Sequence, residues 1–313
     1  MERINVGSVK INNFVLGAGR LGDKKTKKEC FNILDRYLDL CYNTLDVARS
    51  YENGQAEEFL GEYLKNKNRE DVILISKGGF PKDKTKMHLP RLSKEELQSD
   101  LDASLKALNT DYIDIYFLHR DDVLKSPEEL IVTANEFIKQ GKVKEIGASN
   151  WTAGRIETAN HYALKNNLQP FTVSQINYSL AQTTPALTGD ITHVVMNDIE
   201  YAWYKETQFP LIAYSVQAKG FFSKQITGEI LKPSGQKSYL PLKENFRRFD
   251  RINQLAKEKN ESIPALLMSY VLSKGLNASV IGGFSTVEQL NDAEKGINIK
   301  LTEKEINFLE KGI

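Results

Sequence analysis

The sequence Val72-Ile73-Leu74-Ile75-Ser76-Lys77 predicts an apolar β-strand that ends on a charged side chain, and this form is the key to the architecture. Two further predicted strands also end on polar side chains, one on Asp46 and one, Tyr112-Ile113-Asp114-Ile115-Tyr116-Phe117-Leu118, on His119. Runs of this kind are typical of buried parallel strands. All strands of a parallel α/β barrel end on one face, so these polar residues are expected to meet at one site.

Similar β-branched runs alternate with amphipathic helical segments along nearly the whole chain. In one such segment leucines recur every three or four residues from Leu97 to Leu108, and Ser93 with Glu96 forms a capping box before it. This alternation favours an α/β fold, a (β/α)8 TIM barrel forming a single domain over residues 1–313, with a small N-terminal hairpin closing its bottom. The eight predicted strands lie near 14–17, 42–46, 72–77, 112–118, 145–149, 172–177, 210–215 and 278–281.

Composition excludes several classes of partner. The chain has 42 basic and 41 acidic side chains in 313 residues, which gives no electrostatic argument for nucleic acid or a charged membrane surface. No apolar stretch approaches the ~20 residues of a membrane span. Cys30 and Cys41 are too few for a disulfide scaffold and lack the neighbours of a metal site. With no signal peptide at the N-terminus, a cytoplasmic protein is expected, either a monomer or a weak homo-oligomer, without a metal.

A dinucleotide-binding fingerprint of the G-x-G-x-x-G type is missing. Gly17 and Gly19 follow the first strand, but the third glycine is displaced to Gly22, so a tight turn is the favoured interpretation. The segments 178–192 and 217–242 are long for βα loops and are therefore expected to be functional.

The polar residues at the predicted strand ends are hard to explain by structure alone. Each has a structural alternative, such as a helix cap, a lysine reaching solvent or an amide that satisfies buried backbone. Together they suggest a functional site, because the strands are otherwise built from Val, Ile and Leu and burying so many polar groups without partners would cost free energy. They are Asp46, Lys77, His119, Ser149, Asn150, Gln175, Asn177, Tyr214 and Ser215.

Three motifs in order resemble the aldo-keto reductase family, and the resemblance covers about residues 11–311. Residues 43–57, Asn-Thr-Leu-Asp-Val-Ala-Arg-Ser-Tyr-Glu-Asn-Gly-Gln-Ala-Glu, are similar to that family's D-x-A-x-x-Y-x-N-G-x-x-E signature, with its alanine either replaced by Val47 or shifted to Ala48. Residues 101–119 and 141–150 resemble two further family motifs. The resemblance implies a barrel that reduces carbonyl compounds with a nicotinamide cofactor.

The resemblance also implies a catalytic group of Asp46, Tyr51, Lys77 and His119. In this scheme Tyr51 is the proton donor in reduction and the base in oxidation. A phenol with an ordinary pKa near 10 is a poor acid at neutral pH, but an adjacent ammonium stabilises its phenolate. Lys77 would supply that charge, Asp46 would hold Lys77, and His119 would orient the substrate carbonyl.

The family pattern assigns cofactor roles to residues on later strands and loops. Amide and hydroxyl side chains would hold the nicotinamide carboxamide, Tyr214 would stack on its ring, and Lys219 would neutralise phosphate unless it is simply solvated. NADPH is favoured and NADH is possible, because the turn before the last helices lacks the usual Lys or Arg. A capping box of Ser285 and Glu288 is expected there. The cofactor residues are Ser149, Asn150, Gln175, Tyr214, Ser215, Gln217, Lys219, Gly220, Gly283, Ser285, Thr286 and Gln289.

The substrate is expected to be a small carbonyl compound. Residues that flank the catalytic group or its strand ends are predicted to line the pocket, namely Leu21, Phe80, Arg120, Trp151 and Tyr178. Arg120 could meet a polar or anionic substrate or form a surface ion pair. Two other functions stay open: a barrel aldolase using Lys77 as a Schiff-base amine, and a nicotinamide-sensing regulatory subunit.

Overall fold

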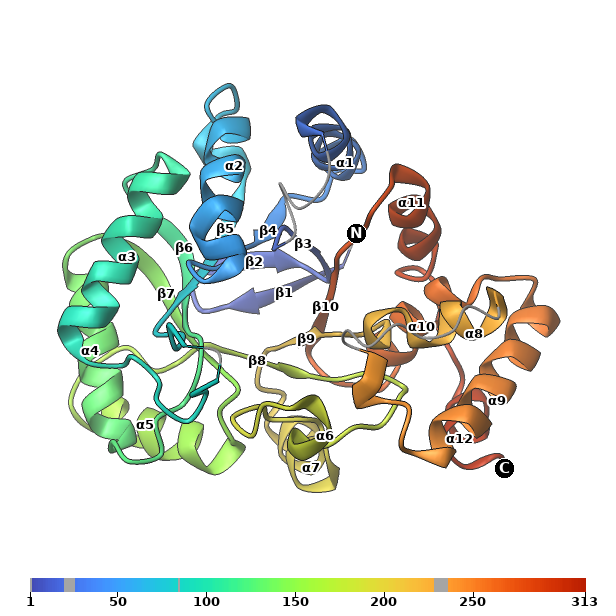
Figure 1. The fold of residues 1–313 in the computed structure, drawn as a ribbon. Helices are drawn as coiled ribbons and strands as arrows, with labels where there is room; N and C mark the ends of the chain where they lie inside the picture. The colour runs from blue at the N-terminus through green and yellow to red at the C-terminus, as the bar shows by residue number, and fades with distance from the viewer. Residues whose placement is uncertain (1, 20–25, 84, 228–235) are drawn as a thin grey trace.

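Eight parallel strands form a closed barrel at the centre of the molecule, and helices surround it (Figure 1). The computed structural model describes residues 2–19, 26–83, 85–227 and 236–313. Strand β10 pairs with both β9 and β3, which closes the sheet and confirms the predicted barrel. The barrel strands are β3 (Phe14–Gly17), β4 (Thr44–Asp46), β5 (Ile73–Gly78), β6 (Ile113–Leu118), β7 (Val143–Ser149), β8 (Val173–Asn177), β9 (Leu211–Tyr214) and β10 (Ala278–Gly282).

The predicted N-terminal hairpin is confirmed and closes one end of the barrel. Strands β1 (Arg3–Val6) and β2 (Val9–Asn12) pair antiparallel. Their apolar side chains form one buried cluster with inward-facing residues of the barrel, including Ile75 and Phe117. The hairpin therefore seals the barrel interior at the end opposite the carboxyl ends of the strands, and the strand ends are left for the site.

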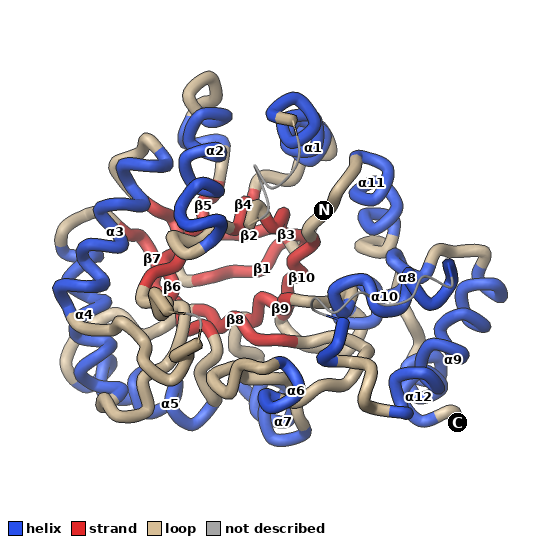
Figure 2. Tube along the Cα trace, in the orientation of Figure 1, coloured by secondary structure: helices blue, strands red, loops and turns tan. Residues whose placement is uncertain are grey.

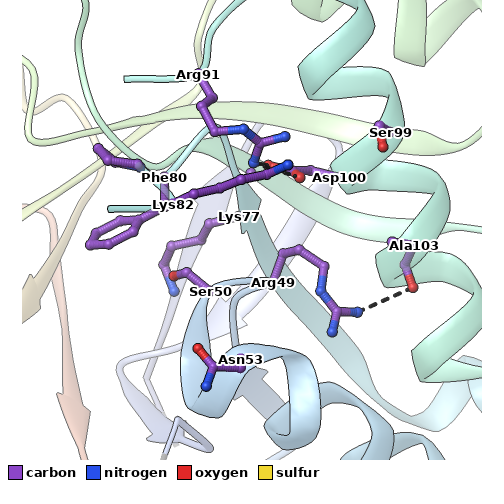
Figure 3. Close-up of a pocket in the computed structure, with 12 residues that line it drawn as sticks. Arg49, Ser50, Asn53, Lys77, Phe80, Lys82, Arg91, Ser99, Asp100 and Ala103 are labelled. Carbon is purple, nitrogen blue, oxygen red and sulfur yellow. Dashed lines mark hydrogen bonds and ion pairs between the residues drawn. The ribbon is translucent and has the colours of Figure 1, made fainter. Parts of the chain in front are cut away.

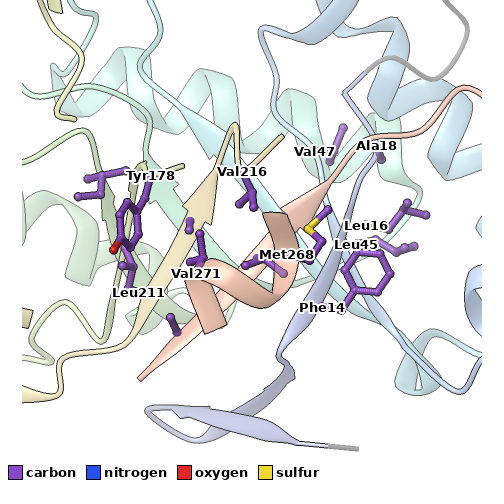
Figure 4. Close-up of a cluster of buried hydrophobic side chains, with 14 of the residues drawn as sticks. Phe14, Leu16, Ala18, Leu45, Val47, Tyr178, Leu211, Val216, Met268 and Val271 are labelled. Carbon is purple, nitrogen blue, oxygen red and sulfur yellow. The ribbon is translucent and has the colours of Figure 1, made fainter. Parts of the chain in front are cut away.

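A shell of helices covers the outside of the strands (Figure 2). Their apolar faces pack against outward-facing strand residues in a second, larger core, part of which Figure 4 shows. The helices are α1 (Lys27–Asp39), α2 (Gln55–Leu64), α3 (Lys94–Leu108), α4 (Pro127–Lys139), α5 (Ala153–Lys165), α6 (Pro185–Thr188), α7 (Asp198–Thr207), α8 (Phe221–Thr227), α9 (Lys243–Lys259), α10 (Ile263–Leu272), α11 (Val287–Lys295) and α12 (Glu303–Lys311).

The predicted row of leucines from Leu97 to Leu108 lies on helix α3. Leu97, Leu101 and Leu108 are buried, and the capping box of Ser93 with Glu96 is present. The long segments after β8 and β9 contain α6 and α8, together with the 3-10 helices η3 (Ala218–Gly220) and η4 (Gln236–Ser238). None of the helices in the described ranges combines the length and the apolar character needed to cross a bilayer.

Candidate active site

Inward-facing strand residues lead directly to the catalytic candidates. Alternation along β5 directs Ile75 and Lys77 to the same side, and Ile75 packs inside the barrel. On β6 Phe117 also packs inside, so His119, two residues farther on, faces the same opening. Asp46 ends β4 and is the register partner of Ile75. The strand pattern thus brings three of the predicted polar side chains together.

Lys77 connects Asp46 with Tyr51. Its Nζ lies 2.6 Å from Oδ1 of Asp46, 2.9 Å from the carbonyl oxygen of Val47 and 3.4 Å from the hydroxyl oxygen of Tyr51. The lysine is fully buried, and burial by itself would lower its pKa. Attraction from Asp46 and Tyr51 outweighs burial and raises the pKa of Lys77 above its ordinary value. Lys77 is therefore an ammonium ion that directs one proton to each of three oxygen atoms.

His119 lies beside Tyr51, with the two ring centroids 5.6 Å apart and the planes at 80°. Burial lowers the pKa of His119 well below its ordinary value, and the positive charges of Arg120 and Lys77 lower it further. The imidazole is therefore neutral at neutral pH. Its Nδ1 atom lies 3.4 Å from Oγ of Ser50.

Tyr51 is carried by a turn with unusual backbone angles, the 3-10 helix η1 (Tyr51–Gly54). Glu52 and Asn53 have φ values of 46° and 55°, and Gly54 has a φ of 94°. Left-handed backbone of this kind costs non-glycine residues about 1 kcal/mol or more each, and it persists only where the surroundings impose it. The turn reverses the chain between β4 and α2, so that the tyrosine hydroxyl reaches Lys77.

A buried ion pair behind this turn holds it in place. Nη1 of Arg49 lies 2.8 Å from Oε2 of Glu57, and the hydroxyl of Ser76 donates to Oε1 of Glu57 at 2.6 Å. Burial raises the pKa of Glu57 even though Ser76 and Arg49 favour its charged form. The pair ties the ends of the η1 turn to Ser76 on the outer side of β5, and the next residue of that strand, Lys77, faces the barrel interior.

The structure adds two residues to the catalytic neighbourhood that the sequence did not place there. Gln175 donates from Nε2 to Oδ2 of Asp46 at 2.9 Å, although the resemblance assigned it to the cofactor. Ser50, which contacts His119, was not predicted at all. Its position next to Tyr51 in the signature motif was the only available signal.

The expected nicotinamide-binding residues form a second connected group next to the first. The hydroxyl of Tyr214 donates to Oδ1 of Asn150 at 2.7 Å, and Nδ2 of Asn150 donates to Oγ of Ser149 at 3.1 Å. Ser149 in turn donates to the carbonyl oxygen of Gln175 at 3.1 Å. The group offers amide and hydroxyl donors and acceptors at the carboxyl ends of β7, β8 and β9, and this donor set fits a planar carboxamide.

The loop after β9 begins with two successive tight turns. Ala218 donates its backbone N–H to the carbonyl of Ser215 at 2.7 Å, and Gly220 donates to that of Gln217 at 2.9 Å. Ser215, Ala218 and Lys219 all have positive φ values between 48° and 58°. Strained backbone clusters at functional sites, so the loop is a reasonable place for a ligand.

Comparison with known proteins agrees with this geometry. The model of the aldo/keto reductase family matches residues 13–312. The chain belongs to the aldo/keto reductase family. It is 28% identical to an aryl-alcohol dehydrogenase from Pestalotiopsis microspora, over 97% of this chain and 79% of that protein. It is 27% identical to norsolorinic acid reductase B from Aspergillus parasiticus, over 97% of this chain and 81% of that protein.

A solved structure shares the fold. The crystal structure of a thermostable aldo-keto reductase, in complex with the inhibitor epalrestat, superimposes with a TM-score of 0.76 over 99% of both chains, at 24% identity. Membership of the family makes the protein an oxidoreductase. Within the described part of the chain, no group of three His, Cys, Asp or Glu residues is arranged to hold a metal ion.

The turn before α11 differs from the sequence prediction. Thr286, rather than Ser285, is the N-cap, and its hydroxyl accepts from the backbone N–H of Gln289. The side chain of Gln289 accepts from the N–H of Ser285 at 2.8 Å, so the predicted pairing of Ser285 with Glu288 is wrong by one residue. Ser285 is the residue immediately before the N-cap. Gly283 lies in the same turn, which carries no cationic side chain for an adenosine phosphate.

The predicted substrate residues divide into two groups. Phe80 lies against His119, with 4.9 Å between the two ring centroids. Arg120 packs over the Phe80 ring and forms a buried ion pair with Asp190 at 2.9 Å, in place of the surface ion pair that was the alternative for it. Leu21 lies outside the described residues.

Trp151 and Tyr178 belong to the core instead of an open pocket. Trp151 has an exposed fraction of 0%, packs edge-on against Phe171 and donates to the carbonyl of Arg120. Tyr178 is buried and its ring contacts that of Tyr270 of α10. Figure 4 shows Tyr178 among the buried apolar side chains. Successive residues of an extended chain point to opposite sides, which turns Tyr178 away from the opening that Asn177 faces.

Proposed function

We propose that the protein reduces aldehydes or ketones to alcohols with Tyr51 as the proton donor and NAD(P)H as the reductant. The observation that carries the proposal is the buried chain from Asp46 through Lys77 to Tyr51, with contacts of 2.6 Å and 3.4 Å, beside a neutral His119. The names of the relatives, an aryl-alcohol dehydrogenase and a norsolorinic acid reductase, support this class of reaction.

Carbonyl reduction adds a hydride to carbon and a proton to oxygen. A reduced nicotinamide cofactor would supply the hydride. Tyr51 would give its hydroxyl proton to the substrate oxygen, and the ammonium of Lys77 would stabilise the negative charge left on the tyrosine oxygen. Asp46 would keep Lys77 in place throughout.

His119 would orient the substrate oxygen. A neutral imidazole carries one N–H, and a hydrogen bond from Ser50 to Nδ1 would leave that N–H on Nε2, free to donate to the carbonyl. Nitrogen NMR of the imidazole tests this assignment, and a proton on Nδ1 would contradict it.

For the cofactor, the connected group of Ser149, Asn150, Gln175 and Tyr214 would hold the nicotinamide end. The turns of Ser215, Gln217, Lys219 and Gly220 would hold the pyrophosphate. Gly283, Ser285, Thr286 and Gln289 would lie at the adenosine end. NADPH is favoured as the family's usual cofactor, but the absence of Lys or Arg in the α11 turn keeps NADH possible. A fluorescence titration with both cofactors decides between them.

The buried ion pair of Lys77 argues against the Schiff-base aldolase. An amine attacks a carbonyl only when it is unprotonated, and the raised pKa of Lys77 keeps it protonated. A complete catalytic group likewise favours an enzyme over a regulatory subunit. The cytoplasmic location expected from the composition stays a prediction.

The decisive experiment compares the wild type with Tyr51→Phe. The wild type should oxidise NADPH in the presence of 4-nitrobenzaldehyde, and Tyr51→Phe should lower kcat at least ~100-fold, because general acid catalysis contributes 10²–10⁴ in rate. Cofactor affinity and the urea midpoint should change little. An unchanged kcat would contradict the role of Tyr51, and failure to bind either cofactor would contradict the proposed function.

A further inference from the structure

A cavity of about 330 Å³ lies beside the catalytic group, between the η1 turn, the segment after β5 and helix α3 (Figure 3). Lys77, Gly78 and Phe80 line it, so it adjoins the carbonyl site directly. Ser50, which contacts His119, also lines it. A ligand that fills this cavity therefore touches the neighbours of Tyr51.

The charged groups of the cavity wall are mainly cationic. Arg49, Lys77, Lys82 and Arg91 line it, and Asp100 is the one carboxylate among the lining residues. Asp100 already accepts hydrogen bonds from Arg91 at 3.0 Å and from the backbone N–H of residue 79 at 2.9 Å. The negative charge of Asp100 is therefore balanced by Arg91, another residue of the cavity wall.

The carboxylates that balance the other cations lie outside the cavity lining. Glu57 pairs with Arg49, and Glu96 pairs with Arg91 at 3.4 Å, but neither carboxylate lines the cavity. Asp46, the partner of Lys77, does not line it either. The positive ends of these pairs line the cavity and their carboxylates do not, which favours an anion inside.

Each arginine keeps donors for a ligand. Arg49 makes its side-chain hydrogen bond and ion pair through Nη1, and Arg91 makes those of its side chain through Nε and Nη1. Lys82 is exposed and makes no ion pair with any described residue. In Figure 3 Lys82 and Arg91 extend toward Asp100, and Arg49 extends toward Ala103, one turn farther along α3. Cationic donors thus approach the cavity from two sides.

We infer that the natural substrate is a carbonyl compound that carries a carboxylate, with the carboxylate in this cavity and the carbonyl at Tyr51. The inference rests on the proposed carbonyl reduction. Arginine side chains bind carboxylates through two N–H donors, and Lys82 adds a charge that has no other partner in the described structure. A neutral substrate would leave these donors in contact with water only.

The test compares anionic aldehydes with neutral ones of the same shape. The probes are 3-carboxybenzaldehyde, 4-carboxybenzaldehyde and 4-(carboxymethoxy)benzaldehyde, each against its primary amide, so that the carboxylate lies at three distances from the carbonyl. At least one acid should exceed its amide about fivefold or more in kcat/KM, the size expected for one partly exposed ion pair. Added salt should reduce that preference.

Two charge reversals on the same loop distinguish an effect of the cavity from a general effect of the protein's charge. Lys82→Glu should lower the acid-to-amide ratio about tenfold, because it replaces attraction by repulsion. Lys86→Glu makes the same change at an exposed lysine that does not line the cavity, and it should leave the ratio within about twofold. Calorimetric binding of the corresponding carboxylated and amidated benzyl alcohols provides a readout that needs no turnover.

The possible outcomes distinguish a failure of the anion site from a failure of the proposed carbonyl reduction. Turnover of every aldehyde with acid-to-amide ratios near one would overturn the inference and leave the proposed reduction standing. Equal loss of preference in Lys82→Glu and Lys86→Glu would also overturn it. Acid-selective binding that Lys82→Glu abolishes, without turnover of any aldehyde, would support the anion site and overturn the proposed reduction.

Discussion

Gln175 on β8 donates a hydrogen bond to Asp46 on β4, across the mouth of the barrel, with 2.9 Å between Nε2 and Oδ2. Asp46 also holds Lys77 through its other oxygen, so one carboxylate links the expected nicotinamide group to the proposed proton-transfer chain. The amide of Gln175 therefore fixes the carboxylate that fixes the lysine. A substitution of Gln175 should therefore affect the rate of turnover as well as the affinity for the cofactor.

Gln175→Glu should make turnover depend strongly on pH. Two carboxylates at hydrogen-bond distance cannot both ionise easily, so they share a proton at lower pH and repel each other at higher pH. We expect kcat of this variant, relative to wild type, to rise by about fivefold from pH 8 to pH 6. Gln175→Leu removes the contact without adding a titratable group and should not show this rise. Identical pH profiles for the two variants would show that Gln175 does not act through Asp46.

Lys77→Met should destabilise the protein as well as slow it. The substitution leaves Asp46 buried beside an apolar side chain, and an unpaired buried charge costs about 3–5 kcal/mol in the free energy of unfolding. Adding Asp46→Asn should recover part of that loss, because the amide oxygen can still accept from Gln175. Urea denaturation of both single variants and the double variant measures the coupling. Strictly additive losses would contradict a direct ion pair.

Acid should destabilise the fold through His193. Burial, reinforced by Arg120 and Lys219 and opposed by Asp190, lowers the pKa of His193 from 6.5 to about 4. The unfolded chain therefore binds the proton first as the pH falls below 6.5, and stability is lost between pH 6.5 and about 4. At pH 7 the folded protein does not bind this proton, and only about a quarter of the unfolded chains do.

The matched variant for this effect is His193→Gln, which keeps an acceptor for Arg120 but does not titrate. Between pH 7 and pH 4.5 the free energy of unfolding of the wild type should fall by about 2 kcal/mol more than that of the variant, from 1.36 kcal/mol per pKa unit. Denaturant titrations at both pH values measure the difference. Parallel losses in the two proteins would mean that other groups cause the acid sensitivity.

Gly54→Ala should disturb the turn that carries Tyr51. Gly54 has a φ of 94°, and an added Cβ atom would overlap the guanidinium of Arg49. We expect a loss of about 2 kcal/mol in the free energy of unfolding, together with reduced turnover, because the Arg49–Glu57 pair must move. Urea denaturation and a standard aldehyde assay measure the two effects.

Gly154→Ala provides the control. Gly154 lies in the first turn of α5, and an added Cβ atom would meet nothing within 4 Å. This substitution should leave turnover unchanged and raise stability by about 0.5 kcal/mol, since alanine restricts the unfolded chain. Equal effects of the two substitutions would contradict the steric argument for Gly54.

Local patterns were enough to predict the barrel and its hairpin. Every predicted strand overlaps an observed one, because each is a short apolar run bounded by helical periodicity, and burial on both faces makes such runs distinct. The cap before α11 was placed one residue too early, since Ser285 and Thr286 both have hydroxyls and only the backbone angles distinguish them.

Strand periodicity alone identifies which polar residues end which strands, because alternation along β5 and β6 aligns Lys77 and His119 with the apolar interior. The contacts of those side chains follow only from the folded structure. Gln175 reaches Asp46 across 129 residues of chain, Trp151 turns into the core, and Lys82 joins Arg49 and Arg91 around one cavity. Such contacts depend on barrel closure and on the direction of each loop side chain, and neither is encoded in local periodicity.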